Sequence, residues 1–215
     1  MSPDARLFIA VDPPGSVAAE IARWARSALE PGRDPSGRSR PGRAPTDGIR
    51  RLPARDLHLT LCFLGDQPVD LVDEIGDLVR GAVTGLAVAG LSAGPLAIGA
   101  PVWLPPRRPR ALALEVHDES GGLAALYDDL RVGLAGAIGW EPERRRLRPH
   151  ITVARMRSWA PPPACSQPTP ALVFEPEAVS LYRSRLESDG AVYQQLARVD
   201  LGGFDPPGAD TPLRD

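Results

Sequence analysis

Lysine is absent from this chain, and cysteine and the aromatic residues are scarce. All 25 basic residues of the 215-residue sequence are therefore arginines, whose planar guanidinium fits phosphate oxygens well. The two cysteines, Cys62 and Cys165, are too few and too far apart in sequence to indicate a disulfide framework. Aromatic residues make up 5% of the chain, which argues against the extended base-stacking platforms of single-strand binders.

Long hydrophobic runs are also missing. No stretch approaches the length of a transmembrane helix, and the apolar run near the N-terminus is too short for a signal peptide. We therefore expect a cytoplasmic protein that does not bind membranes. No spacing of cysteine and histidine is typical of zinc ligands, and we predict neither a metal nor another cofactor. The net charge of −2 means that a contact with RNA would need a local basic patch.

The chain repeats one order of elements, in which a strand and a helix precede a second strand that contains His-x-Thr. Apolar periodicity and turn residues define each element. The first copy comprises residues 6–12, 17–29 and 57–64, and the second comprises residues 111–116, 121–138 and 149–154. We interpret the repeat as a diverged internal duplication, which predicts two similar lobes around a shared cleft.

The remaining segments complete a single two-lobed domain over residues 1–215. We expect a helix over 69–83, short strands at 86–91 and 97–104, and a terminal hairpin. The hairpin strands are residues 179–185 and 192–199. Residues 31–48 are rich in Pro, Gly, Arg and Ser, which predicts a flexible loop insertion, and the Pro/Gly-rich tail 202–215 is predicted to fray.

Two of the three histidines stand in the doubled motif, as His58 with Thr60 and His150 with Thr152. Chance would place Thr two residues after a given His about 3% of the time, so two matches in three are expected on the order of once in a few hundred sequences. Residues i and i+2 of a strand point to the same face, so each His projects beside its Thr. His117 lacks the motif, and we expect it in a solvated turn.

A pair of histidines on facing strands suits in-line displacement at phosphorus. One imidazole takes a proton from the attacking water, and the other gives a proton to the departing oxygen. Histidine can do both near neutral pH because its unperturbed pKa is about 6.5. The threonine hydroxyls can donate hydrogen bonds to the non-bridging oxygens, whose charge grows in the transition state.

Four segments, in this order, resemble a known family: RLFIAVDPP, LHLTLCFLG, RPHITVARMR and LYRSRL. They are similar to the 2′-5′ RNA ligase and RNA 2′,3′-cyclic phosphodiesterase family of the two-histidine phosphoesterase superfamily, over nearly the whole chain. The resemblance implies an α+β, bilobal two-histidine phosphoesterase fold with pseudo-twofold symmetry. Two antiparallel sheets would line a central cleft, with helices outside. It also implies hydrolysis of a terminal 2′,3′-cyclic phosphate to a 2′-phosphate.

The same resemblance implies a role for each motif residue. His58 corresponds to the proton donor for the leaving 3′ oxygen, and His150 corresponds to the proton acceptor from water. Thr60 and Thr152 match phosphate-binding threonines, and Arg155 follows the second motif in a position that could help hold phosphate. The near-symmetry of the site fixes the pair of histidines more firmly than the order of their roles.

Two alternative functions, and the role of the arginine-rich loop, remain open on the sequence. The same histidines would serve 2′-5′ RNA ligation, because the reverse reaction uses the same groups. A non-catalytic module that binds RNA or a nucleotide would also retain them. The arginines of 31–48, with Arg50 and Arg51 beyond, could contact an RNA backbone or belong to a disordered insertion. We expect RNA or a nucleotide with a cyclic phosphate end as partner, no obligatory protein partner, and a monomer.

Overall fold

The computed structural model describes residues 3–29, 48–142, 146–156, 165, 167–188 and 190–202. The strands are β1 (Asp4–Asp12), β2 (Ile49–Arg51), β3 (Leu59–Pro68), β4 (Leu96–Leu104), β5 (Ala111–Asp118), β6 (His150–Met156), β7 (Val173–Phe174), β8 (Ala178–Glu187) and β9 (Gly190–Asp200). The α-helices are α1 (Gly15–Ala28), α2 (Val72–Val88) and α3 (Gly122–Ile138), and the short 3-10 helices are η2 (Ala54–Asp56) and η3 (Val69–Leu71). Every paired strand in this described part is antiparallel to its neighbour.

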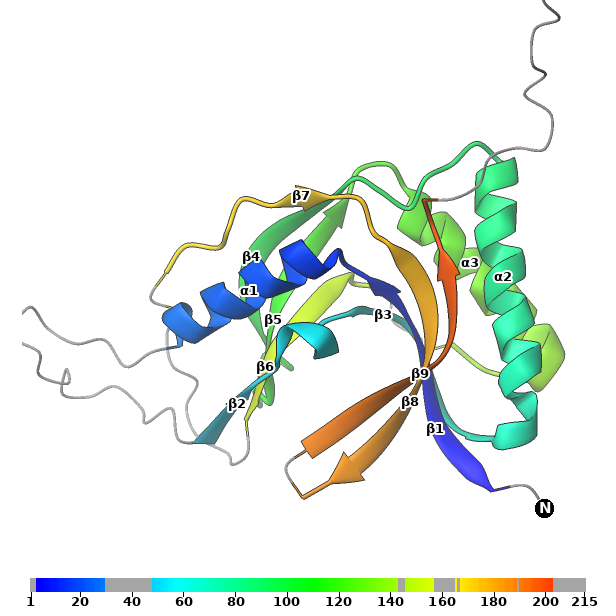
Figure 1. Cartoon of the computed structure of the whole chain (residues 1–215), viewed down its shortest axis with the longest axis horizontal. Helices are drawn as coiled ribbons and strands as arrows, with labels where there is room; N and C mark the ends of the chain where they lie inside the picture. The colour runs from blue at the N-terminus through cyan, green and yellow to red at the C-terminus, as the bar shows by residue number, and fades with distance from the viewer. Residues whose placement is uncertain are drawn as a thin grey trace, which may run out of the picture.

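The strands follow the order β7-β4-β5-β6-β3-β1-β8-β9, with β2 beside β6 (Figure 1). With β2 counted beside β6, the sheet divides into a half of five strands and a half of four, which meet between β6 and β3, where Leu59 pairs with Ile151. In each half the motif strand pairs with the first strand of its own repeat, β3 with β1 and β6 with β5. The predicted α+β fold with duplicated antiparallel sheets is thus confirmed, and the two sheets are continuous at this junction.

The helices of the two repeats are exchanged between the halves. Helix α1 follows β1 in the chain but packs against β2 and β6 of the other half. Helix α3 follows β5 but contacts β3, and it lies beside α2, which covers β8 and β9 (Figure 1). Each half is therefore covered from outside by a helix of the other repeat. This exchange holds the two halves together where the strands alone share little pairing.

The central strand β1 shows why this sequence forms the core. It lies between β3 and β8, and Leu7, Phe8, Ile9 and Ala10 are all buried. The sequence of a strand that is covered on both faces is a continuous apolar run rather than an alternation of apolar and polar residues. The RLFIAVD segment therefore fits the middle of the sheet.

One predicted strand, residues 86–91, is wrong because helix α2 continues through Val88. Ile75, Val79 and Leu86 are buried on one side of this helix, so Leu86 extends the helical spacing rather than starting a strand. The helix ends before Gly90, whose φ of 69° lies in the left-handed region that glycine adopts freely.

Two predicted segments lie outside the described residues. The predicted loop 31–48 is described only at Gly48, and the predicted tail 202–215 only at Gly202. Within the described ranges, no helix is both long and apolar enough to cross a membrane.

Replacing Leu59 by alanine tests the junction between the halves. Leu59 is 1% exposed and pairs with Ile151, so Leu59→Ala should lower the free energy of unfolding by about 2–5 kcal/mol. Leu186→Ala is the matched control, because Leu186 is 77% exposed and its truncation should change stability by less than about 0.5 kcal/mol. Urea denaturation of the three proteins gives both values. Equal stability of the two variants would contradict the role assigned to the junction.

Candidate active site

The junction between β3 and β6 places the two motifs on one face of the sheet. Leu59 and Ile151 pair across it, and both are buried in the core. Because side chains alternate along a strand, the residues before and after Leu59, and those before and after Ile151, point to the opposite face. These four residues are His58, Thr60, His150 and Thr152, and all are half-buried. The alternation thus brings the two predicted motifs to the same surface.

Both imidazoles are held by the same local hydrogen bond. Nδ1 of His58 lies 2.8 Å from the carbonyl oxygen of Asp56, and Nδ1 of His150 lies 2.7 Å from that of Arg148. A carbonyl oxygen can only accept, so in this geometry each Nδ1 carries the proton. Nε2 is then the ring nitrogen left to exchange a proton with a ligand. The repeat therefore presents two equivalent Nε2 atoms.

Aromatic rings surround only the first of these histidines in the described part of the chain. The His58 ring centroid lies 4.8 Å from that of Phe8, 5.0 Å from Tyr193 and 5.8 Å from Tyr182. Burial lowers the pKa of His58 to about 4; the bond to the Asp56 carbonyl opposes this shift, and the charges of Arg155 and His150 add to it. His58 of the free protein is therefore neutral at pH 7.

A buried carboxylate supports one of these rings. The hydroxyl of Tyr182 donates to Oδ1 of Asp12 at 2.8 Å, and Ser180 Oγ donates to Oδ2 at 2.6 Å. Burial raises the pKa of Asp12 despite these two bonds. The Tyr182 ring in turn stacks on His58. This network fixes the aromatic wall beside the imidazole.

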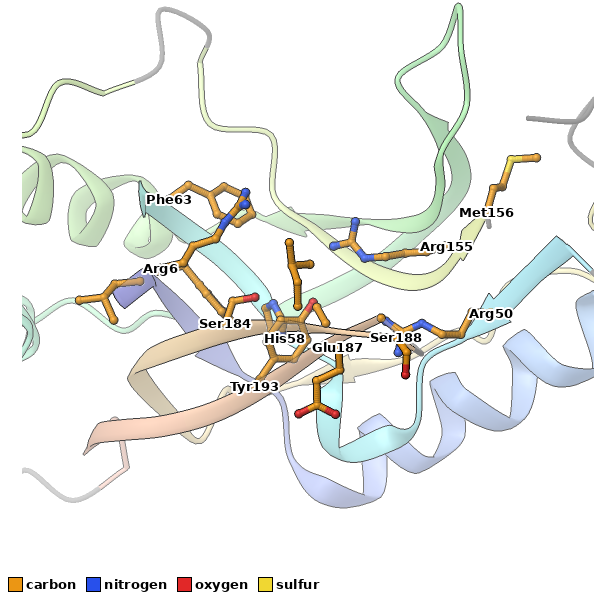
Figure 2. A pocket seen from close by; sticks show the side chains of 15 residues that line it. Arg6, Arg50, His58, Phe63, Arg155, Met156, Ser184, Glu187, Ser188 and Tyr193 are labelled. Atoms are coloured by element: carbon orange, nitrogen blue, oxygen red, sulfur yellow. The ribbon is translucent and has the colours of Figure 1, made fainter. Parts of the chain in front are cut away.

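A cavity of about 490 Å³ opens beside His58 (Figure 2). It is lined mainly by β1, β8 and β9 on one side and by β2 and β6 on the other. Its labelled lining residues in Figure 2 are Arg6, Arg50, His58, Phe63, Arg155, Met156, Ser184, Glu187, Ser188 and Tyr193. The structure thus brings together two of the predicted site residues, His58 and Arg155. His150 acts on His58 through its charge, but the lining includes neither His150 nor the two motif threonines.

Sequence reasoning missed Phe63 because of a β-bulge. Strict alternation from Thr60 would put Cys62 on the same side as Thr60, but the register with β1 shifts between the two. Cys62 is consequently buried in the core, and burial raises the pKa of its thiol to about 12. Phe63 is 54% exposed and lines the cavity instead. No sequence signal marked this bulge.

The third histidine, His117, does not line the cavity. His117 is exposed, as expected, but it belongs to β5 rather than to a turn. Among the described residues, no group of three or more His, Cys, Asp or Glu side chains is arranged to hold a metal ion.

Comparisons with known proteins match this architecture. The sequence model of the 2′-5′ RNA ligase superfamily matches residues 13–187. A Thermus thermophilus RNA 2′,3′-cyclic phosphodiesterase is 31% identical over 166 residues, which cover 74% of this chain and 79% of that protein. The Escherichia coli RNA 2′,3′-cyclic phosphodiesterase is 29% identical over 190 residues, which cover 86% of this chain and 93% of that protein.

Solved structures of related proteins have a similar fold. A crystal structure of a Thermus thermophilus protein superposes with a TM-score of 0.63 at 28% identity, covering 92% of this chain and 98% of that one. Escherichia coli LigT complexed with 3′-AMP superposes with a TM-score of 0.60 at 25% identity, covering 93% of this chain and 99% of LigT.

The pKa of His58 can be measured by NMR titration of its ring signals. We expect a value near 4 without ligand, and Tyr193→Ala should move it toward 6.5 because water then reaches the imidazole. Tyr193→Phe keeps the ring and should leave the pKa low. Because the folded state disfavours the charged ring, the stability contributed by neutral His58 should fall as pH drops from 6.5 toward 4. A pKa between about 6 and 7 in the unmodified protein, the ordinary range for histidine, would contradict this description.

Proposed function

This chain belongs to the 2′-5′ RNA ligase superfamily, and on that premise we propose that it hydrolyses the 2′,3′-cyclic phosphate at the end of an RNA to a 2′-phosphate. One observation carries the proposal. His58 and His150 make the same bond from Nδ1 to a carbonyl oxygen two residues earlier, and their motifs meet on one face of the sheet. Two imidazoles that each present Nε2 on the same surface can act as a paired general acid and general base.

In the proposed reaction, His150 accepts a proton from water as its oxygen attacks phosphorus. The new P–O bond forms opposite the 3′ oxygen, and the bond from phosphorus to that oxygen breaks. His58 gives its proton to the departing 3′ oxygen, which leaves a 3′ hydroxyl and a 2′-phosphate. Thr60 and Thr152 donate hydrogen bonds to the non-bridging oxygens, and Arg155 supplies positive charge to the same group.

The donor role sets a condition on His58. Its pKa near 4 in the free protein leaves Nε2 without a proton at neutral pH. A phosphate anion beside the ring stabilises the charged imidazolium and offsets the charge of Arg155, so substrate binding raises the pKa. The proton that His58 donates is therefore taken up as the substrate binds.

Product analysis tests the reaction itself. With chelator present, the protein should convert an oligoribonucleotide ending in a 2′,3′-cyclic phosphate into one ending in a 2′-phosphate. His58→Ala and His150→Ala should each reduce kcat by about 10²–10⁴-fold, because each removes one proton-transfer group. His117→Ala is the matched control and should retain activity, since His117 lies exposed on β5. No turnover by the unmodified protein, or a strict requirement for metal, would refute the proposal.

A substrate with an activated leaving group separates the two roles. In a nucleoside 2′-(p-nitrophenyl phosphate), p-nitrophenolate departs without needing a proton. His58→Ala should then lose less than about tenfold in rate, whereas His150→Ala should remain impaired by about 10²–10⁴-fold. Release of p-nitrophenolate is followed by absorbance. The opposite pattern would exchange the donor and acceptor assignments.

A further inference from the structure

Two arginines face each other directly across neighbouring strands in the cavity. Arg50 of β2 pairs in register with Arg155 of β6, and both side chains line the cavity beside His58 (Figure 2). Like charges placed directly opposite each other on a sheet are destabilising. The ion pairs formed within the described ranges involve neither arginine, although Glu187 lines the same cavity. Two guanidinium groups that lie opposite each other without an ion pair in the described residues would be stabilised by a bound anion.

The guanidinium of Arg50 is already positioned for such an anion. Its Nη2 is buried and has no hydrogen-bond partner among the residues that the structure describes. The group lies against the backbone of Gly190, where an added Cβ would stand 2.5 Å from Cζ and 2.7 Å from Nη2. Gly190 has a φ of 121°, a conformation open to glycine, so the turn leaves room for the side chain. A buried donor without an acceptor costs free energy that a ligand oxygen would recover.

The next residue of the strand has a structural role instead. Arg51 points to the other face of β2, where its Nη2 donates to the carbonyl oxygen of Leu29 at 3.0 Å. Leu29 caps helix α1, and a cation at a helix C-terminus is stabilised by the helix dipole. Only Arg50 of these two adjacent residues thus faces the cavity.

The two facing arginines serve different parts of the cavity. The charge of Arg155 acts on His58, whereas the charge of Arg50 acts on Asp56. Arg155 belongs to β6, the strand that begins with the second motif, and is therefore near the reacting phosphate of the proposed reaction. Arg50 belongs to β2 and packs against Gly190 at the start of β9. The nearest other anion that an RNA end contains is the phosphate on the 5′ side of its last nucleotide.

We propose that Arg50 binds this 5′-phosphate while Arg155 binds the cyclic phosphate. The inference rests on the proposed function and adds a substrate class: RNA ends and 5′-phosphorylated nucleotides rather than nucleosides that carry a cyclic phosphate alone. A guanidinium suits the role because it makes two parallel hydrogen bonds to a phosphate group.

Two substrates that differ only by a 5′-phosphate test whether Arg50 binds that group. The values of kcat/KM are compared for adenosine 2′,3′-cyclic phosphate and for the same compound with a 5′-phosphate. In the unmodified protein, the 5′-phosphate should raise kcat/KM by about tenfold or more. Arg50→Gln should bring the ratio close to one while changing kcat/KM for the compound without a 5′-phosphate by less than about threefold. Arg23→Gln, which alters an arginine of α1 that is 68% exposed, should preserve the ratio.

Two further variants keep the test independent of folding. Arg50→Lys retains the charge without the planar fork and should restore part of the discrimination. Gly190→Ala leaves Arg50 in the chain but displaces its guanidinium, and it should lower the same ratio. A thermal melt of each variant accompanies the kinetics.

The outcomes distinguish the two proposals. If the unmodified protein hydrolyses both substrates equally well, or if Arg50→Gln lowers both values of kcat/KM by the same factor, the Arg50 assignment is overturned and the proposed function stands. If the protein hydrolyses neither substrate, nor an oligoribonucleotide with a cyclic phosphate end, the proposed function fails, and this inference fails with it.

Discussion

The contact between β3 and β6 determines where the chemistry-bearing residues of this protein lie. Leu59 and Ile151 pair there and point into the core, so the histidine and threonine of each motif are turned to the other face. A shift of this register by one residue would reverse every side chain and bury the polar ones. The helices that each repeat packs against the other half stabilise the junction. Core packing and the placement of both motifs thus depend on the same pair.

Symmetry of the backbone does not make the two histidines equal. Both imidazoles are oriented by the same bond to a carbonyl oxygen, but His58 alone is surrounded by Phe8, Tyr182 and Tyr193 in the described residues. Both tyrosines come from the outer strands of the first half, which the internal repeat does not include. The duplicated strands hold two imidazoles in similar orientations, and the strands outside the repeat make their surroundings differ.

Much of the fold could be predicted because the repeat is visible as apolar periodicity and as His-x-Thr. The motif residues follow from local alternation, which holds across the junction. Alternation fails at the bulge before Cys62, so Phe63 could not be assigned to the cavity. Arg50 stood out in sequence only as one of several arginines, because its partner Arg155 lies far along the chain and their register depends on tertiary structure. Contacts between distant strands leave no local pattern.

In the proposed mechanism, His58 and His150 act on a single phosphate. Titration of the protein with a nucleoside 2′-phosphate, followed by NMR of the histidine rings, tests whether they do. If both imidazoles contact the same phosphate, the signals of both histidines should shift together, with one dissociation constant and saturation at one equivalent. A response from one histidine alone, or two separate binding curves, would contradict the claim that the two motifs form one site.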